Sequence, residues 1–180
     1  HVDDFLYSIG NDDFNKNVIA KIKEIYSISS QHIGDFDYVG LKIKQDQTGI
    51  YLSQPEFTKN LEPLDTSSLK IKKEEYLDSK WTEAYQCLLG KIQWLTHQTR
   101  PDIAFHAFTY SLFQKAPTFE RLKGLNKLVS MAKDGPPHLK LSNLDRNSLK
   151  IICFSDASFA NVLPDNTTSG EGYLVFIGDK

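Results

Sequence analysis

The sequence predicts an α+β fold, and three changes of pattern along the chain indicate it. Apolar and polar residues alternate in 39–52, and apolar residues recur at helical spacing between 81 and 132. Short β-branched and aromatic runs then return at 149–154 and 172–177. The pattern changes near residues 80 and 140, which are therefore the candidate boundaries between parts of the chain.

The first part begins with a predicted strand and helix. Residues 5–9 are apolar and aromatic, as in a strand, and the helix-capping residues Asn11, Asp12 and Asp13 follow them. A helix over 14–28 is predicted from one apolar stripe, formed by Phe14, Val18, Ile22, Ile25 and Tyr26.

A hairpin and a short helix come next. Val39, Leu41 and Ile43 alternate with Lys42 and Lys44, and the "DQTG" stretch at 46–49 supplies the turn to a return strand that begins with Ile50 and Leu52. Proline can open a helix, so a short helix is predicted over 55–61. Residues 62–78 are polar and lysine-rich, and we interpret them as a linker.

The middle of the chain is predicted to be helical. Its first apolar stripe comprises Trp81, Tyr85, Leu88, Ile92 and Leu95. The "TRPD" stretch at 99–102 breaks this helix and starts another, with Thr99 as the expected cap and Arg100 on the surface. The last stripe comprises Leu122, Leu125, Val129 and Ala132, and "DGPP" at 134–137 ends the block.

The final part is predicted to be a pair of antiparallel strands. "LKIICF" (149–154) and "GYLVFI" (172–177) have the composition of buried strands. The polar, turn-forming residues between them favour a hairpin-like return. Asp156 should therefore lie at or near the end of a central strand, next to an antiparallel partner that contains Tyr173 to Phe176.

The charge of the chain is unevenly distributed. The formal net charge of −2 does not indicate a general polyanion-binding protein. Residues 101–150, however, carry eight Lys and Arg against four Asp and Glu, whereas 151–180 carry one against four. A basic middle beside acidic ends suits a protein that holds phosphates in one place and metal ions in others.

The two cysteines and the short apolar runs indicate the cellular compartment in which the chain is expected. Cys87 and Cys153 lie in apolar segments, so we expect reduced core residues and a cytosolic or nuclear setting. The apolar runs are too short to span a bilayer, and no membrane partner is expected. The chain begins with His1, which leads us to expect a piece of a longer protein.

Asp3 and Asp4 form an acidic pair with no neighbouring cation. One interpretation is a solvated turn, since Asp is a common turn former. The other is a divalent-cation site at the tip of a hairpin, where both carboxylates can approach one Mg²⁺. Turn chemistry does not require Val2 before the pair or the aromatic run after it, and the two alternatives stay open on these residues alone.

Asp156 presents the same choice. It follows an apolar strand and is followed by the small residues Ala157 and Ser158, which leave room for a metal beside a bulky substrate. The alternative is a carboxylate that caps a strand end. His97, His106 and His138 lack metal-ligand spacing and are interpreted as structural, and no phosphate-binding loop, dinucleotide fingerprint or zinc pattern is present.

Four stretches in series resemble copia-type retrotransposon polyproteins. "HVDDFLYSIG" resembles the Tyr-X-Asp-Asp hairpin of reverse transcriptases, and "DFDYVGLKIKQDQTGIYLSQPEFTKNL" is similar to the segment after that hairpin in the family. "YQCLLGKIQWLTHQTRPDIAF" resembles the signature beyond the polymerase palm, and "IICFSDASFAN" with "SGEGYLVFIG" resembles the start of ribonuclease H. Their order and spacing agree with the family over nearly the whole chain.

The resemblance implies three parts. Residues 1–62 would be the end of a polymerase palm, 63–138 a helical thumb or connection, and 139–180 the first two antiparallel strands of a ribonuclease H-like fold. It also implies site residues: Asp3 and Asp4 as polymerase carboxylates, Asp156 as the first ribonuclease H carboxylate, and Tyr38, Gly40 and Lys42 as nucleic-acid contacts in the hairpin that positions the primer strand. The charge excess of 101–150 predicts further nucleic-acid contacts at Arg121, Lys123 and Lys127, with a solvated helix face as the alternative.

The resemblance further implies an RNA-directed DNA polymerase with ribonuclease H activity. Mg²⁺, with Mn²⁺ as the alternative, would be the cofactor. The partners would be an RNA/DNA template–primer duplex, a deoxynucleoside triphosphate and the rest of the polyprotein, in cytoplasmic virus-like particles or in the nucleus. The rival interpretation is a non-catalytic nucleic-acid- or protein-binding module derived from such an element.

Two departures from the family qualify these implications. His1 stands where the family usually has an aromatic residue. The family's other palm carboxylate, its fingers and its later ribonuclease H carboxylates have no counterpart in this sequence. We therefore expect this chain alone to lack polymerase activity.

Overall fold

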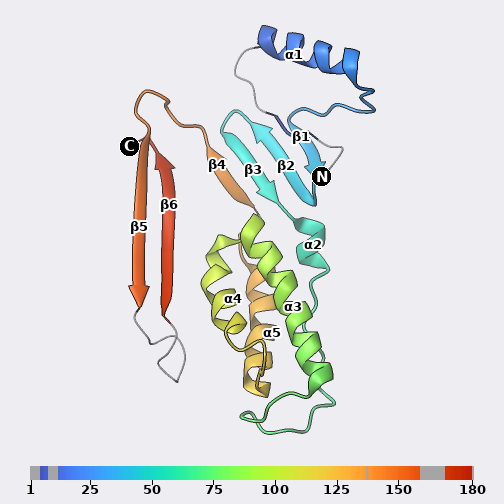
Figure 1. The fold of residues 1–180 in the computed structure, drawn as a ribbon, viewed down its shortest axis with the longest axis vertical. Helices are drawn as coiled ribbons and strands as arrows, with labels where there is room; N and C mark the ends of the chain where they lie inside the picture. Colours follow the sequence, from blue (N-terminus) through green and yellow to red (C-terminus); the bar gives the residue numbers. More distant parts are fainter. Residues whose placement is uncertain (1–4, 8–11, 137, 159–168, 180) are drawn as a thin grey trace.

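The structure, a computed structural model, describes residues 5–7, 12–136, 138–158 and 169–179 (Figure 1). It is mixed α and β, with antiparallel sheets and several helices, as the α+β prediction requires. The elements are α1 (Asp12–Ile25), β1 (Asp35–Tyr38), β2 (Leu41–Asp46), β3 (Gly49–Ser53), α2 (Pro55–Lys59), α3 (Ser79–Gln98), the 3₁₀ turn η1 (Pro101–Ile103), α4 (Ala104–Ser111), α5 (Phe119–Asp134), β4 (Leu139–Ser142), β5 (Lys150–Ser158) and β6 (Gly170–Gly178).

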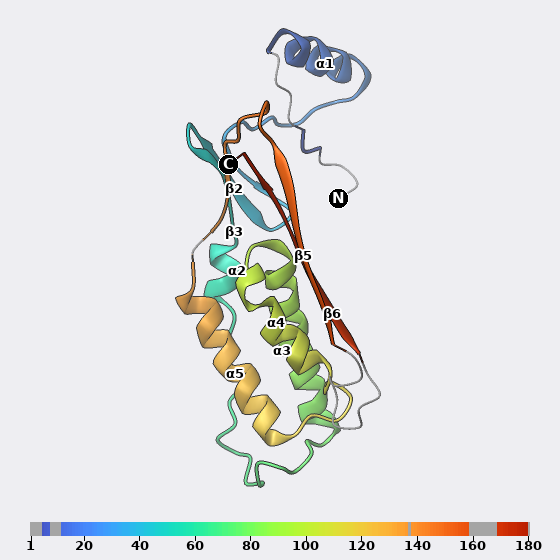
Figure 2. The same cartoon turned by 90° about the vertical axis from the view of Figure 1, so that its left-hand side faces the viewer.

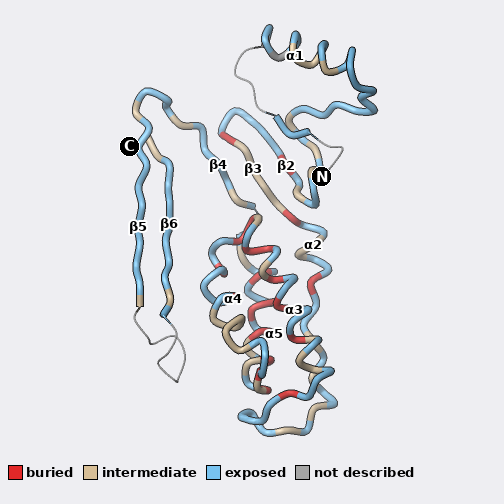
Figure 3. Tube along the Cα trace, in the orientation of Figure 1, coloured by how far each residue is buried: buried red, intermediate tan, exposed pale blue. Residues whose placement is uncertain are grey.

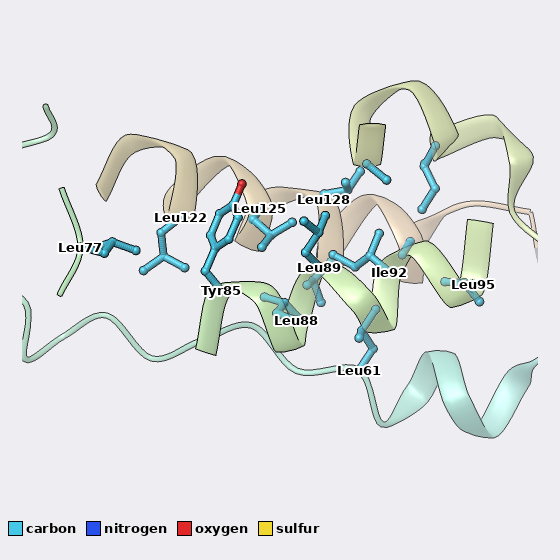
Figure 4. Packing of buried hydrophobic residues seen from close by; sticks show 14 of the residues in the cluster. Leu61, Leu77, Tyr85, Leu88, Leu89, Ile92, Leu95, Leu122, Leu125 and Leu128 are labelled. Atoms are coloured by element: carbon cyan, nitrogen blue, oxygen red, sulfur yellow. The ribbon is translucent and has the colours of Figure 1, made fainter. Parts of the chain in front are cut away.

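The largest group of buried side chains lies between α3, α4 and α5, which we call the helical unit (Figure 3). The predicted stripes are confirmed: Tyr85, Leu88, Ile92 and Leu95 of α3 and all four predicted residues of α5 are buried. Trp81 is only partly buried and packs at the edge of this core. Figure 4 shows Leu61 and Leu77, from outside the three helices, entering the same cluster.

Residues 62–78 are not a free linker, which corrects the prediction. Leu77 is buried, and Leu64, Leu69 and Ile71 pack against the core. The side-chain amide of Asn126 accepts from the Leu64 amide at 2.9 Å and donates to the Leu64 carbonyl at 2.8 Å. The polar composition was misleading because only a few residues of this segment are apolar, and these few pack against the core. We call residues 62–78 the strap.

The hairpin lies in a four-stranded antiparallel sheet in the order β1-β2-β3-β4. Its first turn contains Val39 at φ 48° and Gly40 at φ 77°, and positive φ at both positions is what a type I′ turn requires. In the "DQTG" turn, Asp46 Oδ1 accepts from the amide and the hydroxyl of Thr48, both at 2.7 Å.

β4 was not predicted, and it divides the segment 139–180 between two sheets. Leu139 pairs with Leu52 and Leu141 with Ile50, so these residues extend the hairpin sheet. Gly49 makes this pairing possible, since a Cβ there would collide with the Leu141 carbonyl oxygen. Four residues are too few to show a clear period, and their partner strand lies far away in the sequence.

The "TRPD" stretch breaks and restarts the helix as predicted, but two of its residues differ from expectation. Arg100 is buried, with 4% of its surface exposed, rather than lying on the surface. Thr99 ends α3 instead of capping the next helix, and its hydroxyl donates to Gln54 Oε1 at 2.9 Å. Arg100 is buried because its guanidinium meets the last carbonyls of α5.

The last two strands pair antiparallel, as predicted, and each is longer than expected. They form a separate two-stranded ribbon, however, rather than the buried strands that were predicted. β5 pairs antiparallel with β6 over nine positions, from Lys150 opposite Gly178 to Ser158 opposite Gly170. Among the described residues no third strand joins this sheet. Its apolar side chains are consequently exposed, among them Ile151 at 72% and Tyr173 at 77%.

Three further predictions need correction. Residues 5–7 are exposed and form no strand, since no described strand lies beside them to pair with. The predicted helix over 14–28 is present as α1, which ends at Ile25, and Phe14, Ile25 and Tyr26 are exposed rather than buried. Cys87 and Cys153 are free but exposed, because Cys87 lies on the outer side of α3 and Cys153 on the uncovered ribbon.

Candidate nucleic-acid interface

Three predicted nucleic-acid contacts, Arg121, Lys123 and Lys127, lie on the first half of α5. They line one open pocket of about 550 Å³. Its other lining residues are Lys73, Tyr110, Glu120 and Gly124. Four cationic residues and one carboxylate therefore line this pocket, which we call the basic pocket.

The strap fixes the position of Lys73 against the start of α5. The amide of Phe119 donates to the Glu75 carbonyl at 3.0 Å, and the amide of Glu120 donates to the Lys73 carbonyl at 2.9 Å. Thr118 caps the same helix by accepting from the Arg121 amide at 3.4 Å. The first amides of α5 are thus satisfied, and the backbone of Lys73 is tied to the helix that carries the other cations.

Aromatic rings support two of the cations. The guanidinium carbon of Arg121 lies 3.8 Å from the centre of the Phe113 ring, and Lys123 Nζ lies 4.2 Å from that of Phe119. Such cation–π contacts hold a cation against the protein through a ring face. They leave hydrogen-bond donors of Arg121 and Lys123 available to an anionic ligand.

The wall of the pocket is made by close packing of Tyr110 on Gly124. A Cβ at position 124 would collide with the Tyr110 hydroxyl oxygen, so a larger residue here would have to displace the Tyr110 ring. The Tyr85 hydroxyl donates to the Tyr110 carbonyl at 2.8 Å and holds the backbone of α4 in place. Burial raises the pKa of Tyr85, which keeps this hydroxyl protonated as a donor.

The hairpin residues predicted to contact nucleic acid lie elsewhere. Tyr38 is half-buried at the end of β1, Gly40 is in the turn, and Lys42 is exposed on β2 opposite Asp37. Figure 2 shows the sheet beyond one end of the helical unit, while the start of α5 lies at the other end. The register sets Tyr38 opposite Leu41 on the half-buried face of the sheet and Lys42 opposite Asp37 on its exposed face. The structure therefore gathers the three α5 residues at one pocket, does not gather the hairpin residues on one surface, and keeps the two groups apart.

The predicted metal ligands are not assembled among the residues that the structure describes. Asp3 and Asp4 lie outside these residues. Asp156 is exposed near the end of β5, opposite Gly172, so its antiparallel partner strand is as predicted. Among the described residues β5 has a neighbour on one side only, so the predicted central position of its strand is not found. Within the described residues no three His, Cys, Asp or Glu side chains gather where they could hold a metal ion.

Sequence reasoning missed Lys73 because it treated the strap as a linker. The available signal was the lysine content of residues 70–73, which are "KIKK".

Comparisons of the chain with protein-family models, curated proteins and solved structures found no match. No helix in the described part of the chain is long and apolar enough to cross a membrane.

Proposed function

We propose that this chain is part of the reverse transcriptase and ribonuclease H of a copia-type retrotransposon, and that it binds a template–primer duplex through the basic pocket. The observation that carries the binding proposal is the convergence of Lys73, Arg121, Lys123 and Lys127 from two separate segments. Each segment alone is a lysine-rich surface, whereas together they form a concave cationic site.

Phosphate contacts supply most of the sequence-independent affinity of nucleic-acid-binding proteins. An open site lined by four cations fits a charged backbone better than it fits an apolar ligand. Glu120 is the one carboxylate in the lining, and it leaves the excess of positive charge intact. The hairpin residues Tyr38, Gly40 and Lys42 would contact the same duplex at a second place, nearer the polymerase site.

In this proposal Asp3 and Asp4 hold Mg²⁺, or Mn²⁺, for DNA synthesis from a deoxynucleoside triphosphate, and Asp156 holds metal for RNA cleavage. The described residues do not complete a metal site, because Asp156 supplies one carboxylate and Mg²⁺ takes several oxygen ligands. The remaining ligands would come from the parent polyprotein. Cytoplasmic particles are the proposed setting, with the nucleus as the alternative.

The second candidate is a binding module without catalysis. The basic pocket supports this candidate equally well, because binding a duplex there needs no metal. Weak binding of Mn²⁺ at Asp156, as one carboxylate of an incomplete site can give, separates the two. Paramagnetic broadening of NMR signals around residues 154–158, lost in Asp156→Asn, would support the catalytic lineage. Broadening that survives this substitution would show that Mn²⁺ is not held by Asp156, and the binding module would then be the supported function.

The duplex-binding proposal is tested by the salt dependence of affinity for an RNA/DNA hybrid, measured by fluorescence anisotropy. Replacing Arg121, Lys123 and Lys127 together by Ala should lower the slope of log affinity against log salt by roughly 2 to 3. The matched control removes three lysines from α1, namely Lys16, Lys21 and Lys23, and should leave the slope nearly unchanged.

Lys73→Ala adds a test that the sequence alone did not suggest. Its loss should lower the slope by roughly 0.9, as for one phosphate contact. If the α1 control reduces the slope as much as the α5 variant does, binding follows net charge alone and the basic pocket is not the site.

A further inference from the structure

The basic pocket contains one side chain whose hydrogen-bonding chemistry differs from that of its neighbours. The side chains of its four cationic residues carry only donors, whereas the carboxylate of Glu120 carries only acceptors. A phosphate group is itself an acceptor, so it can engage the cations but not this carboxylate. Phosphate binding alone therefore gives Glu120 no role in the pocket.

The carboxylate of Glu120 is available to a ligand. Glu120 is exposed, and it takes part in neither of the ion pairs found in the described part of the chain. The nearby cations Arg121 and Lys123 lie over aromatic rings instead of pairing with it. An acceptor thus stays open beside the donors that would hold a phosphate.

Two hydrogen bonds fix the backbone at the start of α5, where Glu120 lies. Its amide donates to the Lys73 carbonyl at 2.9 Å, and the next amide donates to the Thr118 hydroxyl at 3.4 Å. Lys123 and Lys127 follow Glu120 by three and seven positions, so the three residues lie on one face of the helix. A strand that lies along this face meets the acceptor first and then the cations.

We propose that Glu120 recognises the sugar of the bound strand, by accepting a hydrogen bond from a ribose 2′-hydroxyl. The basic pocket then holds the RNA strand of an RNA/DNA hybrid, because deoxyribose has no hydroxyl at this position. The inference rests on the proposed duplex binding and names the strand that the pocket selects. It involves no metal ion and no polymerase site.

The ribose hydroxyl is the donor that fits this place. It is bonded to the carbon next to the one that carries the 3′-phosphate, so every ribonucleotide offers a donor beside an anion. The amino groups of the bases are the other donors, but in a duplex they take part in base pairing. The alternative role of Glu120 is a favourable interaction with the dipole at the start of α5. That role would affect the stability of the helix without distinguishing RNA from DNA.

The test compares two hybrids of one sequence by fluorescence anisotropy at fixed salt, one with an RNA strand and one with a 2′-fluoro RNA strand. Fluorine preserves the A-form of the strand but cannot donate, so the comparison separates the hydroxyl from the shape of the duplex. The unaltered chain should bind the RNA hybrid about 5- to 10-fold more tightly, as for one hydrogen bond. Glu120→Ala should remove this preference, and Glu120→Gln, which keeps a carbonyl acceptor, should retain part of it.

The matched control is Glu24→Ala, which removes the same charge from α1, at the opposite end of the molecule from the start of α5 (Figure 1). It should leave the ratio of the two affinities unchanged. The ratio is the readout because loss of a negative charge beside the cations should raise the affinity for both hybrids. Equal affinities of the unaltered chain, or a preference that survives Glu120→Ala, would overturn the inference while the proposed duplex binding stands. If instead the triple α5 variant leaves the salt slope unchanged, the proposed function fails, and this inference fails with it.

Discussion

Arg100 donates two parallel hydrogen bonds to Asp102, from Nε to Oδ1 at 2.8 Å and from Nη2 to Oδ2 at 2.7 Å. The same guanidinium donates to the carbonyls of Met131 and Ala132 in the last turn of α5. Arg100 therefore joins the break between α3 and α4 to the end of α5. A side chain expected on the surface instead connects three elements of the helical unit.

Replacing Arg100 should destabilise the chain more than replacing its acidic partner. Arg100→Ala leaves buried carbonyls of α5 without a donor, and we expect a loss of about 2 to 4 kcal/mol in the free energy of unfolding. Asp102→Asn should cost less than about 1 kcal/mol, because the Asp102 side chain is 43% exposed and can be solvated. Urea unfolding followed by circular dichroism measures both, and equal losses would contradict the assignment.

The same pair predicts a dependence of stability on pH. The hydrogen bonds from Arg100 lower the pKa of Asp102 below its ordinary value of 3.8. A carboxyl group with a lowered pKa in the folded state contributes its stability above the ordinary value, and the contribution is lost as pH falls through the folded value. The decrease in urea midpoint below about pH 4 should therefore be smaller in Asp102→Asn. It should not vanish, because hydrogen bonds from Thr48 and Ser67 also lower the pKa of Asp46 and Asp65.

Replacing either of two helical glycines by alanine should change the stability of the chain, in opposite directions at the two positions. A Cβ at Gly124 would collide with the Tyr110 ring, so Gly124→Ala should cost about 1 to 3 kcal/mol of stability and weaken duplex binding by displacing the pocket wall. Nothing lies within 4 Å of a Cβ at Gly90 in α3. Gly90→Ala should therefore stabilise the chain by about 0.5 to 1 kcal/mol through helix propensity. Thermal unfolding distinguishes them, and a stabilising Gly124→Ala would disprove the packing argument.

Asn126 should hold the strap, and through it the basic pocket. Asn126→Ala removes both hydrogen bonds to Leu64, and we expect a loss of about 1 to 3 kcal/mol. Asn126→Asp keeps the acceptor for the Leu64 amide but loses the donor to its carbonyl, so its stability should be intermediate. Amide exchange of residues 64–77 should accelerate in both variants. Unchanged exchange there would show that the apolar contacts of the strap suffice.

The helical unit was the part of the fold best predicted from sequence. Residues such as Leu122 and Ala132 repeat at the helical period because one face of α5 is buried, and that face is visible in the sequence. β4, the packing of the strap and the burial of Arg100 depend on partners far away in the sequence. No local pattern encodes such partners, which is why these features were missed.

The candidate site was likewise predicted only in part from the sequence. Arg121, Lys123 and Lys127 were found because the positive charge excess of 101–150 is visible in the sequence, whereas Lys73 joins them only after the strap has folded back. The expected burial of Cys153 was wrong because an apolar strand was taken as evidence of a covered one. The roles of Asp3 and Asp4 rest on family resemblance and stay predictions.

The pairing of β3 with β4 constrains the order in which the chain folds. These strands adjoin in the sheet although the whole helical unit lies between them in the sequence. Closing so long a loop in a disordered chain is entropically costly, whereas closing it across folded helices is less so. We therefore expect the helices to form first and β4 to join the sheet in a later kinetic phase. The β1–β3 meander, which closes only short loops, should form independently of that phase.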